Sequence, residues 1–344
     1  MRMKTKLKIL IYALLVATMS LPASADNGST AYEFLNVTPS SRVYGLGGHN
    51  LSIIDDDINL VEQNPALLGP EFEKQIGVGY MRYLGNSNFM NAAFGNGIGD
   101  HSAWAVRVQH FGYGKMTAAN PDGTITGTFS PSDLAVTGVY SHDISSRWRG
   151  GIALKFISSS YEAYSAFAIC TDLGVNYYND ESDFSFSIVA KNLGGQVKKF
   201  SDSYSSLPWD LQMGFSKGLT SAPLRISVTA TNLRRWKLPY MDREDKNSST
   251  SGLVEKNSFM SNLFRHLTFG VELLPSDKFY IGLGYDYRTR SDMSTYSRNF
   301  ISGFSLAAGL KSSSFGVGLA FAQPHTGGTT FMLNLTLTLS SLLH

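Results

Sequence analysis

The sequence has few charges, a single cysteine and no long apolar run beyond its first residues. Charged residues make up 16% of the 344, and one cysteine, Cys170, excludes a disulfide scaffold. The mean hydropathy of −0.08 argues against a bundle of membrane helices, because only the extreme N-terminus carries an apolar stretch approaching bilayer length. The 29 basic and 27 acidic residues give a net charge of +2 without a Lys/Arg cluster, so no nucleic-acid partner is expected. Any insertion into a membrane would therefore use strands.

The N-terminus has the pattern of a secretory signal peptide. Basic residues in its first positions are followed by an apolar run from Ile9 to Val16, and then by the small residues Ala23 and Ala25 that a signal peptidase accepts. We expect a signal peptide over residues 1–25, with cleavage after Ala25. A single anchor helix is the alternative, but its apolar core is short and Pro22 interrupts its end. The mature chain is therefore expected outside the cytoplasm.

Residues 26–73 differ in composition from the rest of the chain. They combine prolines, glycines and the acidic run Asp55–Asp57 with short apolar pieces, and they show no sustained period of two. Such a composition is typical of turns and short helices. We expect a compact N-terminal plug over residues 26–73, with Asp55–Asp57 in a solvated turn. The alternative, a Ca²⁺ site at the three aspartates, lacks a surrounding loop of further oxygen ligands.

From residue 74 onward, large apolar side chains alternate with small or polar ones, which is the period of β-strands. In one segment Ile281 and Leu283 oppose Gly282 and Gly284, and the 21 Phe and 17 Tyr of the chain exclude disorder. The segments are about ten residues long, close to the roughly 9 to 11 residues of a tilted transmembrane strand. About fourteen such segments occur, near residues 74–84, 88–95, 102–111, 133–142, 147–158, 166–179, 183–192, 210–218, 223–232, 265–273, 277–288, 301–310, 313–322 and 329–340.

The links between these segments alternate between tight turns and long polar loops. Outer-membrane barrels have short periplasmic turns and longer extracellular loops, whereas a secreted β-sandwich, the alternative, has no reason for this rhythm. The first link, Gly85 to Ser87, is the exception, being short where a long loop is allowed. The sequence predicts an all-β protein, a transmembrane antiparallel β-barrel over residues 74–344 in the outer membrane of a diderm bacterium. Both mature termini are expected in the periplasm and the long loops outside the cell.

No arrangement typical of catalysis or metal binding accompanies this pattern. The seven histidines are scattered without a pair at zinc-ligand spacing, and the glycine-rich pieces lack the spacing of a nucleotide-binding loop. No serine lies in a nucleophile elbow, and Cys170 alternates onto the small face of its segment, where it would pack in the lumen. We therefore expect no enzyme, no cofactor and no metal site.

The loop from Leu233 to Phe264 is the best binding candidate. It combines cations with aromatic rings, a composition enriched at interface anchors. The alternative is a mobile polar loop, because residues 242–251 look solvated. The candidate partner-binding residues are Arg234, Arg235, Trp236 and Tyr240.

The N-terminal segment contains four distinctive pieces, Tyr32–Val37, Ser40–Gly48, Asp55–Asn59 and Asn64–Leu68. Together they resemble the PorV/PorQ family of the type IX secretion system, and most closely its PorQ members. This family is similar in fold to the FadL fatty-acid channel, a fourteen-stranded outer-membrane barrel with an N-terminal plug. The plug motif within these pieces comprises Arg42, Gly45, Gly47, Gly48, Asn64, Pro65 and Ala66.

The resemblance implies a function that periodicity does not show. PorQ-like proteins anchor a cell-surface attachment complex of Bacteroidetes, which processes secreted cargo and links it to lipopolysaccharide. The partners implied are PorZ as the direct contact, the PorU sortase and the PorV carrier in the same complex, and the lipid and lipopolysaccharide of the outer membrane. No catalytic residues carry over from this family.

Two other functions are consistent with the same pattern. A FadL-like channel would pass a hydrophobic small molecule from the outer loops past a movable plug near Gly45 to Gly48. An adhesin or structural barrel would need only its exposed loops. The sequence leaves the three alternatives open.

Overall fold

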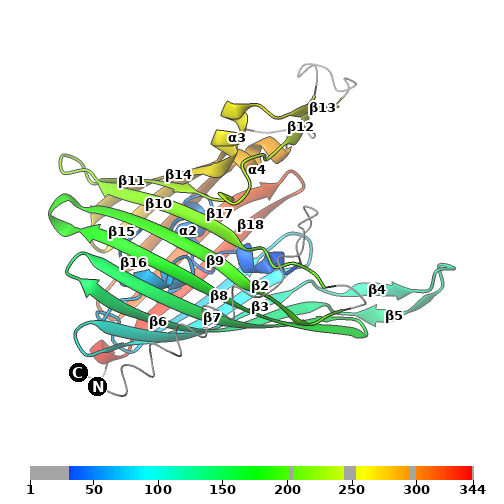
Figure 1. Cartoon of the computed structure of the whole chain (residues 1–344), viewed down its shortest axis with the longest axis horizontal. Helices are drawn as coiled ribbons and strands as arrows, with labels where there is room; N and C mark the ends of the chain where they lie inside the picture. Colours follow the sequence, from blue (N-terminus) through cyan, green and yellow to red (C-terminus); the bar gives the residue numbers. More distant parts are fainter. Residues whose placement is uncertain (1–30, 201–203, 244–252, 294–299, 343–344) are drawn as a thin grey trace.

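The computed structural model describes residues 31–200, 204–243, 253–293 and 300–342. The predicted signal peptide and the start of the predicted plug lie outside these residues. Fourteen antiparallel strands form a closed barrel, as predicted, and β1 pairs with β18 to close it (Figure 1). The barrel strands are β1 (Gln75–Arg82), β2 (Asn88–Ile98), β3 (Ser102–Gly112), β6 (Ser132–Ser145), β7 (Trp148–Tyr161), β8 (Tyr164–Asn179), β9 (Phe184–Lys198), β10 (Asp210–Gly218), β11 (Leu224–Ala230), β14 (Leu267–Ser276), β15 (Phe279–Asp286), β16 (Phe304–Lys311), β17 (Phe315–His325) and β18 (Gly328–Thr338).

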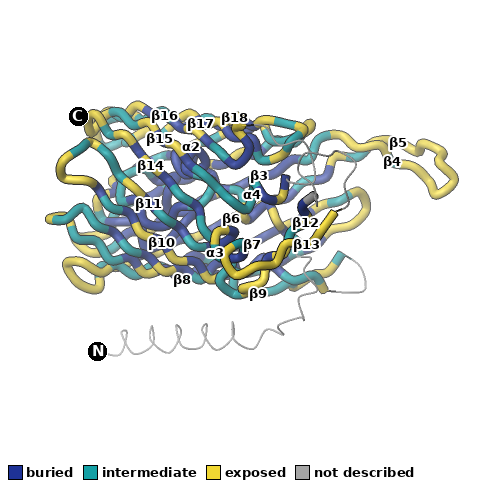
Figure 2. The backbone as a smooth tube through the Cα atoms, turned by 90° about the horizontal axis from the view of Figure 1, so that it is seen from above, coloured by how far each residue is buried: buried dark blue, intermediate teal, exposed yellow. Residues whose placement is uncertain are grey.

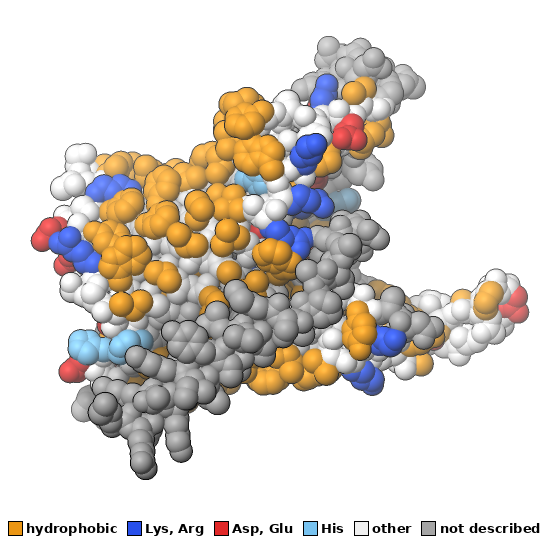
Figure 3. All heavy atoms as spheres, in the orientation of Figure 1, with side chains coloured by type: hydrophobic (Ala, Val, Ile, Leu, Met, Phe, Trp, Pro, Cys, Tyr) orange, Lys and Arg blue, Asp and Glu red, His pale blue; other side chains and the backbone are white. Residues whose placement is uncertain are grey.

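Side chains alternate between the two faces of the barrel wall. Along β3, Trp104, Val106 and Val108 are exposed on the outer face, whereas Ala103 and Ala105 are buried. Large apolar side chains belong on the outer face because it contacts lipid, while small and polar side chains face the interior. Figure 3 shows the resulting band of apolar side chains over the barrel wall.

The links between strands differ at the two ends of the barrel. One end, called here the short-turn end, has the links 99–101, 146–147, 180–183, 219–223, 277–278 and 312–314. The opposite end, called the long-loop end, has the four long links 113–131, 199–209, 231–266 and 287–303. Two further links at the long-loop end, 162–163 and 326–327, are short as well, whereas the sequence singled out the first link alone. The link 162–163 is tight because β7 and β8 extend further than predicted and Glu162 adopts a positive φ of 53°.

The described ends of the chain lie at opposite ends of the barrel. The N–H of Ala31 donates a hydrogen bond of 3.1 Å to the carbonyl of Ser206, at the long-loop end. After β18 the chain lies beside Lys74 at the short-turn end, where the N–H of Leu339 donates a hydrogen bond of 3.1 Å to the carbonyl of Lys74. The expected periplasmic position of the mature N-terminus at Asp26 falls outside the described residues.

Three of the four long loops contain regular structure where polar loops are expected. Strands β4 (Met116–Ala119) and β5 (Ile125–Phe129) form a hairpin that projects beyond the barrel (Figures 1 and 2). A second arm pairs β12 (Tyr240–Arg243) with β13 (Leu253–Lys256) and is followed by helix α3 (Phe259–His266). Helix α4 (Tyr287–Asp292) follows β15. Among the described residues, no helix is both long and apolar enough to cross a bilayer.

Residues 31–73, called here the inner segment, lie within the barrel (Figures 1 and 2). Side chains at the start of each of three elements accept a backbone N–H and so fix where it begins: Ser40 for α2, Asp57 for η2 and Asn64 for η3. Helix α2 packs against β15 to β18, η2 against β1, β2 and β18, and η3 against β6 to β8. The elements are η1 (Glu33–Asn36), α2 (Ser41–Gly45), η2 (Ile58–Glu62) and η3 (Pro65–Leu67).

Glycines on the inner face of the wall let the inner segment approach closely. A Cβ atom on Gly284 would collide with the backbone where Leu46 joins Gly47. A Cβ atom on Gly151 would collide with the backbone of Pro65. Since these contacts are to backbone and not to the tip of a flexible side chain, no larger residue fits without displacing the inner segment.

Candidate functional site

A buried cluster of charges joins the inner segment to three strands of the wall. The ammonium of Lys155 lies 2.9 Å from a carboxylate oxygen of Glu62 and 2.7 Å from one of Asp172. Arg107 lies 3.5 Å from Glu62 and donates a hydrogen bond of 2.8 Å to the carbonyl of Ile58. All four charged side chains are at most 2% exposed. Opposite charges at this depth offset the large cost of removing each one from water.

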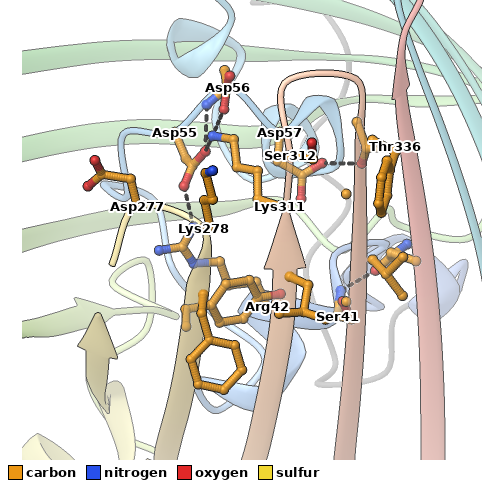
Figure 4. Close-up of a pocket in the computed structure, with 18 of the residues that line it drawn as sticks. Ser41, Arg42, Asp55, Asp56, Asp57, Asp277, Lys278, Lys311, Ser312 and Thr336 are labelled. Atoms are coloured by element: carbon orange, nitrogen blue, oxygen red, sulfur yellow. Dashed lines mark hydrogen bonds and ion pairs between the residues drawn. The ribbon is translucent and has the colours of Figure 1, made fainter. Parts of the chain in front are cut away.

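A second cluster of charges surrounds Arg42 nearer the short-turn end. The guanidinium of Arg42 lies 2.5 Å from Glu272 of β14, pairs with Asp55 and stacks over the ring of Tyr280, 4.5 Å from its centroid. Lys311 reaches the other side of Asp55 at 2.5 Å (Figure 4). One inner-segment cation and one inner-segment carboxylate are thereby tied to β14 and β16.

The acidic run Asp55–Asp57 is only partly a solvated turn: the Asp56 side chain is 47% exposed, but the run as a whole is tied to the wall. Asp55 is 16% exposed and pairs with two cations, and Lys311 also pairs with Asp56. Asp57 accepts a hydrogen bond of 3.0 Å from the hydroxyl of Thr336. The run borders a cavity of about 310 Å³ that is also lined by apolar residues of β15 and β17 (Figure 4). The prediction missed the contacts to the wall because Lys311 and Thr336 lie more than two hundred residues away along the chain.

The charge clusters change the pKa values of the carboxyls of the inner segment. Burial by itself would raise the pKa of Asp55, but the charges of Arg42 and Lys311 outweigh it and hold that pKa below its ordinary value. The pKa of Glu62 is lowered in the same way against burial, by Lys155 and Arg107. Each lowered pKa favours the folded arrangement while the carboxyl is ionised.

Acidification is expected to loosen the inner segment. The stability that Asp55 and Glu62 contribute is present above the ordinary carboxyl pKa of about 4 and is lost as the pH falls through the lowered folded values. Burial raises the pKa of Asp57, so this carboxyl contributes in the opposite sense and offsets part of the loss. The measurement is hydrogen exchange of residues 55–62 against pH, corrected for intrinsic rates. The double variant Asp55→Asn/Glu62→Gln should lose the loosening on acidification and keep only the opposite contribution of Asp57, and an unchanged loosening would contradict the assignment.

A chain of aromatic rings lines the interior at the long-loop end. Ring centroids lie 4.8 Å apart for Phe111 and Tyr113, 5.6 Å for Tyr113 and Tyr161, and 5.4 Å for Tyr161 and Phe200. The ring of Tyr32, at the start of the inner segment, stacks on Phe200 at 6.3 Å. The aromatic cluster defined by these five residues joins a larger buried apolar group on several strands.

The first turn of the inner segment covers this aromatic cluster. Phe34 and Leu35 of η1 are 3% and 1% exposed and pack in the same apolar group. The hydroxyls of Tyr113 and Tyr161 donate hydrogen bonds of 2.6 and 3.0 Å to the Asp133 carboxylate, which orients the rings. The inner segment and the wall thus enclose an apolar cluster at the long-loop end, with η1 as its cover.

The four predicted partner-binding residues lie together at the long-loop end, and three of them pack on neighbours. Arg234 stacks on Trp209 at 4.6 Å, and the ring of Tyr240 lies 4.9 Å from the guanidinium of Arg265. Trp236 stacks on His266 with centroids 5.2 Å apart and is 43% exposed. Arg234 and Arg235 line a polar cavity of about 480 Å³ together with His49, Asp210 and Asp286. Their role in binding a partner stays a prediction.

The predicted plug motif consists of residues that fit the inner segment to the wall. Gly47 and Gly48 have positive φ values of 96° and 85°, which favour glycine where α2 ends. Asn64 donates hydrogen bonds to the carbonyl of Leu51 at 3.2 Å and to the hydroxyl of Ser187 at 3.1 Å. Of the remaining members, Arg42 belongs to the second charge cluster. Gly45 lies against Ala307 of the wall, and Pro65 and Ala66 lie against Gly151.

Cys170 lies where its alternation predicts. It is 2% exposed on the inner face of β8, within the apolar group of the lumen.

Sequence reasoning did not single out Arg107, Lys155, Asp172 or Glu272. The available signal was a charged residue at an inward position of a transmembrane strand, where a charge needs a partner.

Comparison with solved structures identifies the fold. The toluene transporter TbuX of Ralstonia pickettii matches with a TM-score of 0.51 and 12% identity, over 88% of this chain and 98% of its own. The monoaromatic hydrocarbon channel CymD matches with a TM-score of 0.50 and 12% identity, over 89% of this chain and 98% of its own. The fold is that of a FadL-like outer-membrane barrel. Neither a known family model nor a curated protein matches the sequence.

These similar structures are transporters and channels and not enzymes. They do not test the secretion hypothesis. Because the identities are low, the likeness concerns the fold alone.

Proposed function

We propose that this FadL-like barrel is a channel for hydrophobic small molecules. The observation that carries the proposal is the aromatic cluster of the lumen, which meets the long-loop end under the first turn of the inner segment. Similar folds belong to proteins described as a toluene transporter and a monoaromatic hydrocarbon channel. A flat apolar molecule suits such rings, because offset and edge-to-face contacts each add about 0.5–1.5 kcal/mol beyond burial.

The inner segment is the gate of the proposed channel. A ligand that enters among Phe111, Tyr113 and Phe200 takes the place of Tyr32 and Phe34, so η1 must leave the cluster. The two charge clusters hold the deeper part of the inner segment against the wall. Entry at the long-loop end and release at the short-turn end are then separate steps, the second of which requires movement of α2 or the Asp55–Asp57 run.

Replacement of Phe111 by alanine is expected to weaken binding of toluene by roughly tenfold, since it removes ring contacts and buried apolar area. Binding to the full chain in detergent micelles is measured by calorimetry. The matched control is Phe156→Ala on β7, because Phe156 is 42% exposed on the lipid-facing side. Toluene binding that is absent from the wild type, or equal in the two variants, would remove the aromatic cluster from the proposal.

We also propose, as a second candidate, that the barrel docks a type IX secretion and attachment complex. The observation that favours it is the pair of arms at the long-loop end, which the channel function does not use. In the β4–β5 hairpin Met116 and Ile125 are 42% and 70% exposed, and in the β12–β13 arm Leu253 is 52% exposed. The resemblance of the N-terminal pieces points to PorZ as the direct partner and to PorU and PorV in the same complex, at a surface rich in lipopolysaccharide.

The two candidates predict different phenotypes. Deletion of the gene should release secreted cargo into the medium or hold it in the cell if the barrel docks the complex. Normally displayed cargo, with loss of uptake of a hydrophobic nutrient, would instead support the channel.

Shortening one arm tests docking more sharply. Replacement of residues 240–256 by a short Gly/Ser turn should leave a folded barrel that no longer retains PorZ on affinity purification. A second variant shortens the β4–β5 hairpin at residues 117–128, and loss of PorZ in only one of the two variants would identify the arm that binds it. Full retention of PorZ by both variants would exclude the arms from docking.

A further inference from the structure

Helix α3 turns its apolar face outward and its polar face toward the protein, whereas a helix on a water-soluble domain does the reverse. Its apolar residues lie on one face, since residues three and four apart are neighbours on a helix. Phe259 is 66% exposed, Met260 56% and Phe264 39%, and Leu263 lies between them on the same face. The outward face of this helix is therefore its apolar one.

The opposite, polar face of α3 is buried and hydrogen-bonded. The Asn262 side chain accepts a hydrogen bond of 2.9 Å from the N–H of Leu238. Arg265 pairs with Asp292 of α4 at 2.7 Å. Both ring nitrogens of His266 lie against carbonyl oxygens, at 2.7 and 3.0 Å. These contacts fix the rotation of the helix, so its apolar face cannot turn inward without breaking them.

The apolar face of α3 continues into the lipid-facing band of the barrel. The ring of Phe264 lies 6.5 Å from that of Phe269, at the start of β14. The outward row of β14 then runs on through Val271 and Leu273, which are 41% and 38% exposed. Figure 3 shows apolar side chains over α3 that join those of the barrel wall below it. Trp236 extends the same surface, with its ring 5.2 Å from that of Phe259.

We propose that α3 is an interfacial membrane helix that inserts its apolar face among the lipids at the rim of the barrel. Its occupant is lipid and not a protein because the face is continuous with a surface that already contacts acyl chains. The exposed ring of Trp236 suits the headgroup level, where tryptophan is enriched. Exposed cations beside it, Arg235 and Lys237, suit anionic headgroups. The membrane boundary at this side of the barrel therefore lies above α3, and the β12–β13 arm rises from it.

The test places a nitroxide label on α3 and measures what surrounds it. Met260→Cys is labelled in the full chain and reconstituted in dioleoylphosphatidylcholine vesicles. Collisions with oxygen, which dissolves in lipid, are compared with collisions with a water-soluble nickel chelate. Unlabelled Cys170 gives little background because it is 2% exposed. The matched controls are Val271→Cys on the lipid-facing row and Ile125→Cys on the β4–β5 hairpin.

The label at Met260 should resemble the label at Val271, with an oxygen-to-nickel ratio roughly tenfold above that at Ile125. A ratio equal to that at Ile125 would show that α3 is in water and overturn the proposal. Low access to both reagents would show that a second copy of the chain covers the helix, which overturns it as well. Quenching of Trp236 by brominated lipid, taken as the difference between wild type and Trp236→Phe, checks the result with no substitution in α3 itself. None of these outcomes depends on whether the barrel is a channel or a docking component.

Discussion

Replacement of Lys155 by methionine is expected to release the inner segment from the wall near η2 and η3. The change leaves the carboxylates of Glu62 and Asp172 buried at 2% exposure without the ammonium that lies between them. Breaking a buried pair by removing one partner costs about 3–5 kcal/mol, because the remaining charge stays away from water. Hydrogen exchange of residues 58–67 in micelles should accelerate by roughly two to four orders of magnitude, while the barrel strands stay protected.

Two controls separate the loss of charge balance from the change in shape. The double variant Lys155→Met/Asp172→Asn leaves Glu62 paired with Arg107 and carries no unpaired carboxylate in this cluster, so it should recover part of the protection. Lys198→Met, at an exposed strand end, should have an effect within about 0.5 kcal/mol. Equal exchange in Lys155→Met and the wild type would mean that this cluster does not hold the inner segment in place.

The largest expected functional effect comes from Gly284→Val. The added side chain would occupy the position of the backbone between Leu46 and Gly47, so α2 has to leave the inner face of β15. Barrel diameter grows with strand number, and a fourteen-stranded wall without its inner segment encloses an aqueous path. We expect the wild type to show little ion conductance in planar bilayers and Gly284→Val to show long-lived open steps.

The matched control for this variant is Gly138→Val. A Cβ atom on Gly138 of β6 would meet no heavy atom within 4 Å among the described residues, and the position is exposed. The same substitution should therefore leave the conductance at the wild-type level. Open steps in both variants would attribute the conductance to a weakened barrel wall, whereas closed behaviour in both would mean that α2 does not seal the lumen.

The strands could be predicted from the sequence because lipid and lumen impose different requirements on alternate residues. Along β15, Ile281 and Leu283 face lipid and Gly282 and Gly284 face the inner segment, so the period of two is strong. The hairpins in the long loops could not be predicted in this way. Every residue of β13 is exposed and so are most of those of β4, so their two faces meet the same solvent and no alternation is required.

The contacts of the inner segment lie beyond what periodicity can predict. Glycines such as Gly47 and Gly48 indicated turns from composition, which agrees with their positive φ values. Arg42 was singled out as part of a motif, but its partner Glu272 belongs to a distant strand. The ion pair between Arg42 and Glu272 forms because the closed barrel places an inward residue of β14 at the same depth along the barrel axis as Arg42.

The outward orientation of the apolar face of α3 also could not be predicted from the sequence. Its sequence contains an apolar and a polar face, yet the sequence does not state which face lies outward. The hydrogen bonds of Asn262 and His266 decide it, because buried polar groups need partners and the barrel rim supplies them.

The sequence by itself determined the strand number, the inward and outward faces of the wall, and the short elements of the inner segment, because each follows from residues close together along the chain. The tertiary structure alone decided which charges meet, which glycines admit the inner segment, and which face of α3 is turned outward. The physical reason is that closing the barrel sets the depth and direction of every inward side chain. Coulombic and steric contacts act over a few ångströms in space, however far apart the residues lie in the sequence.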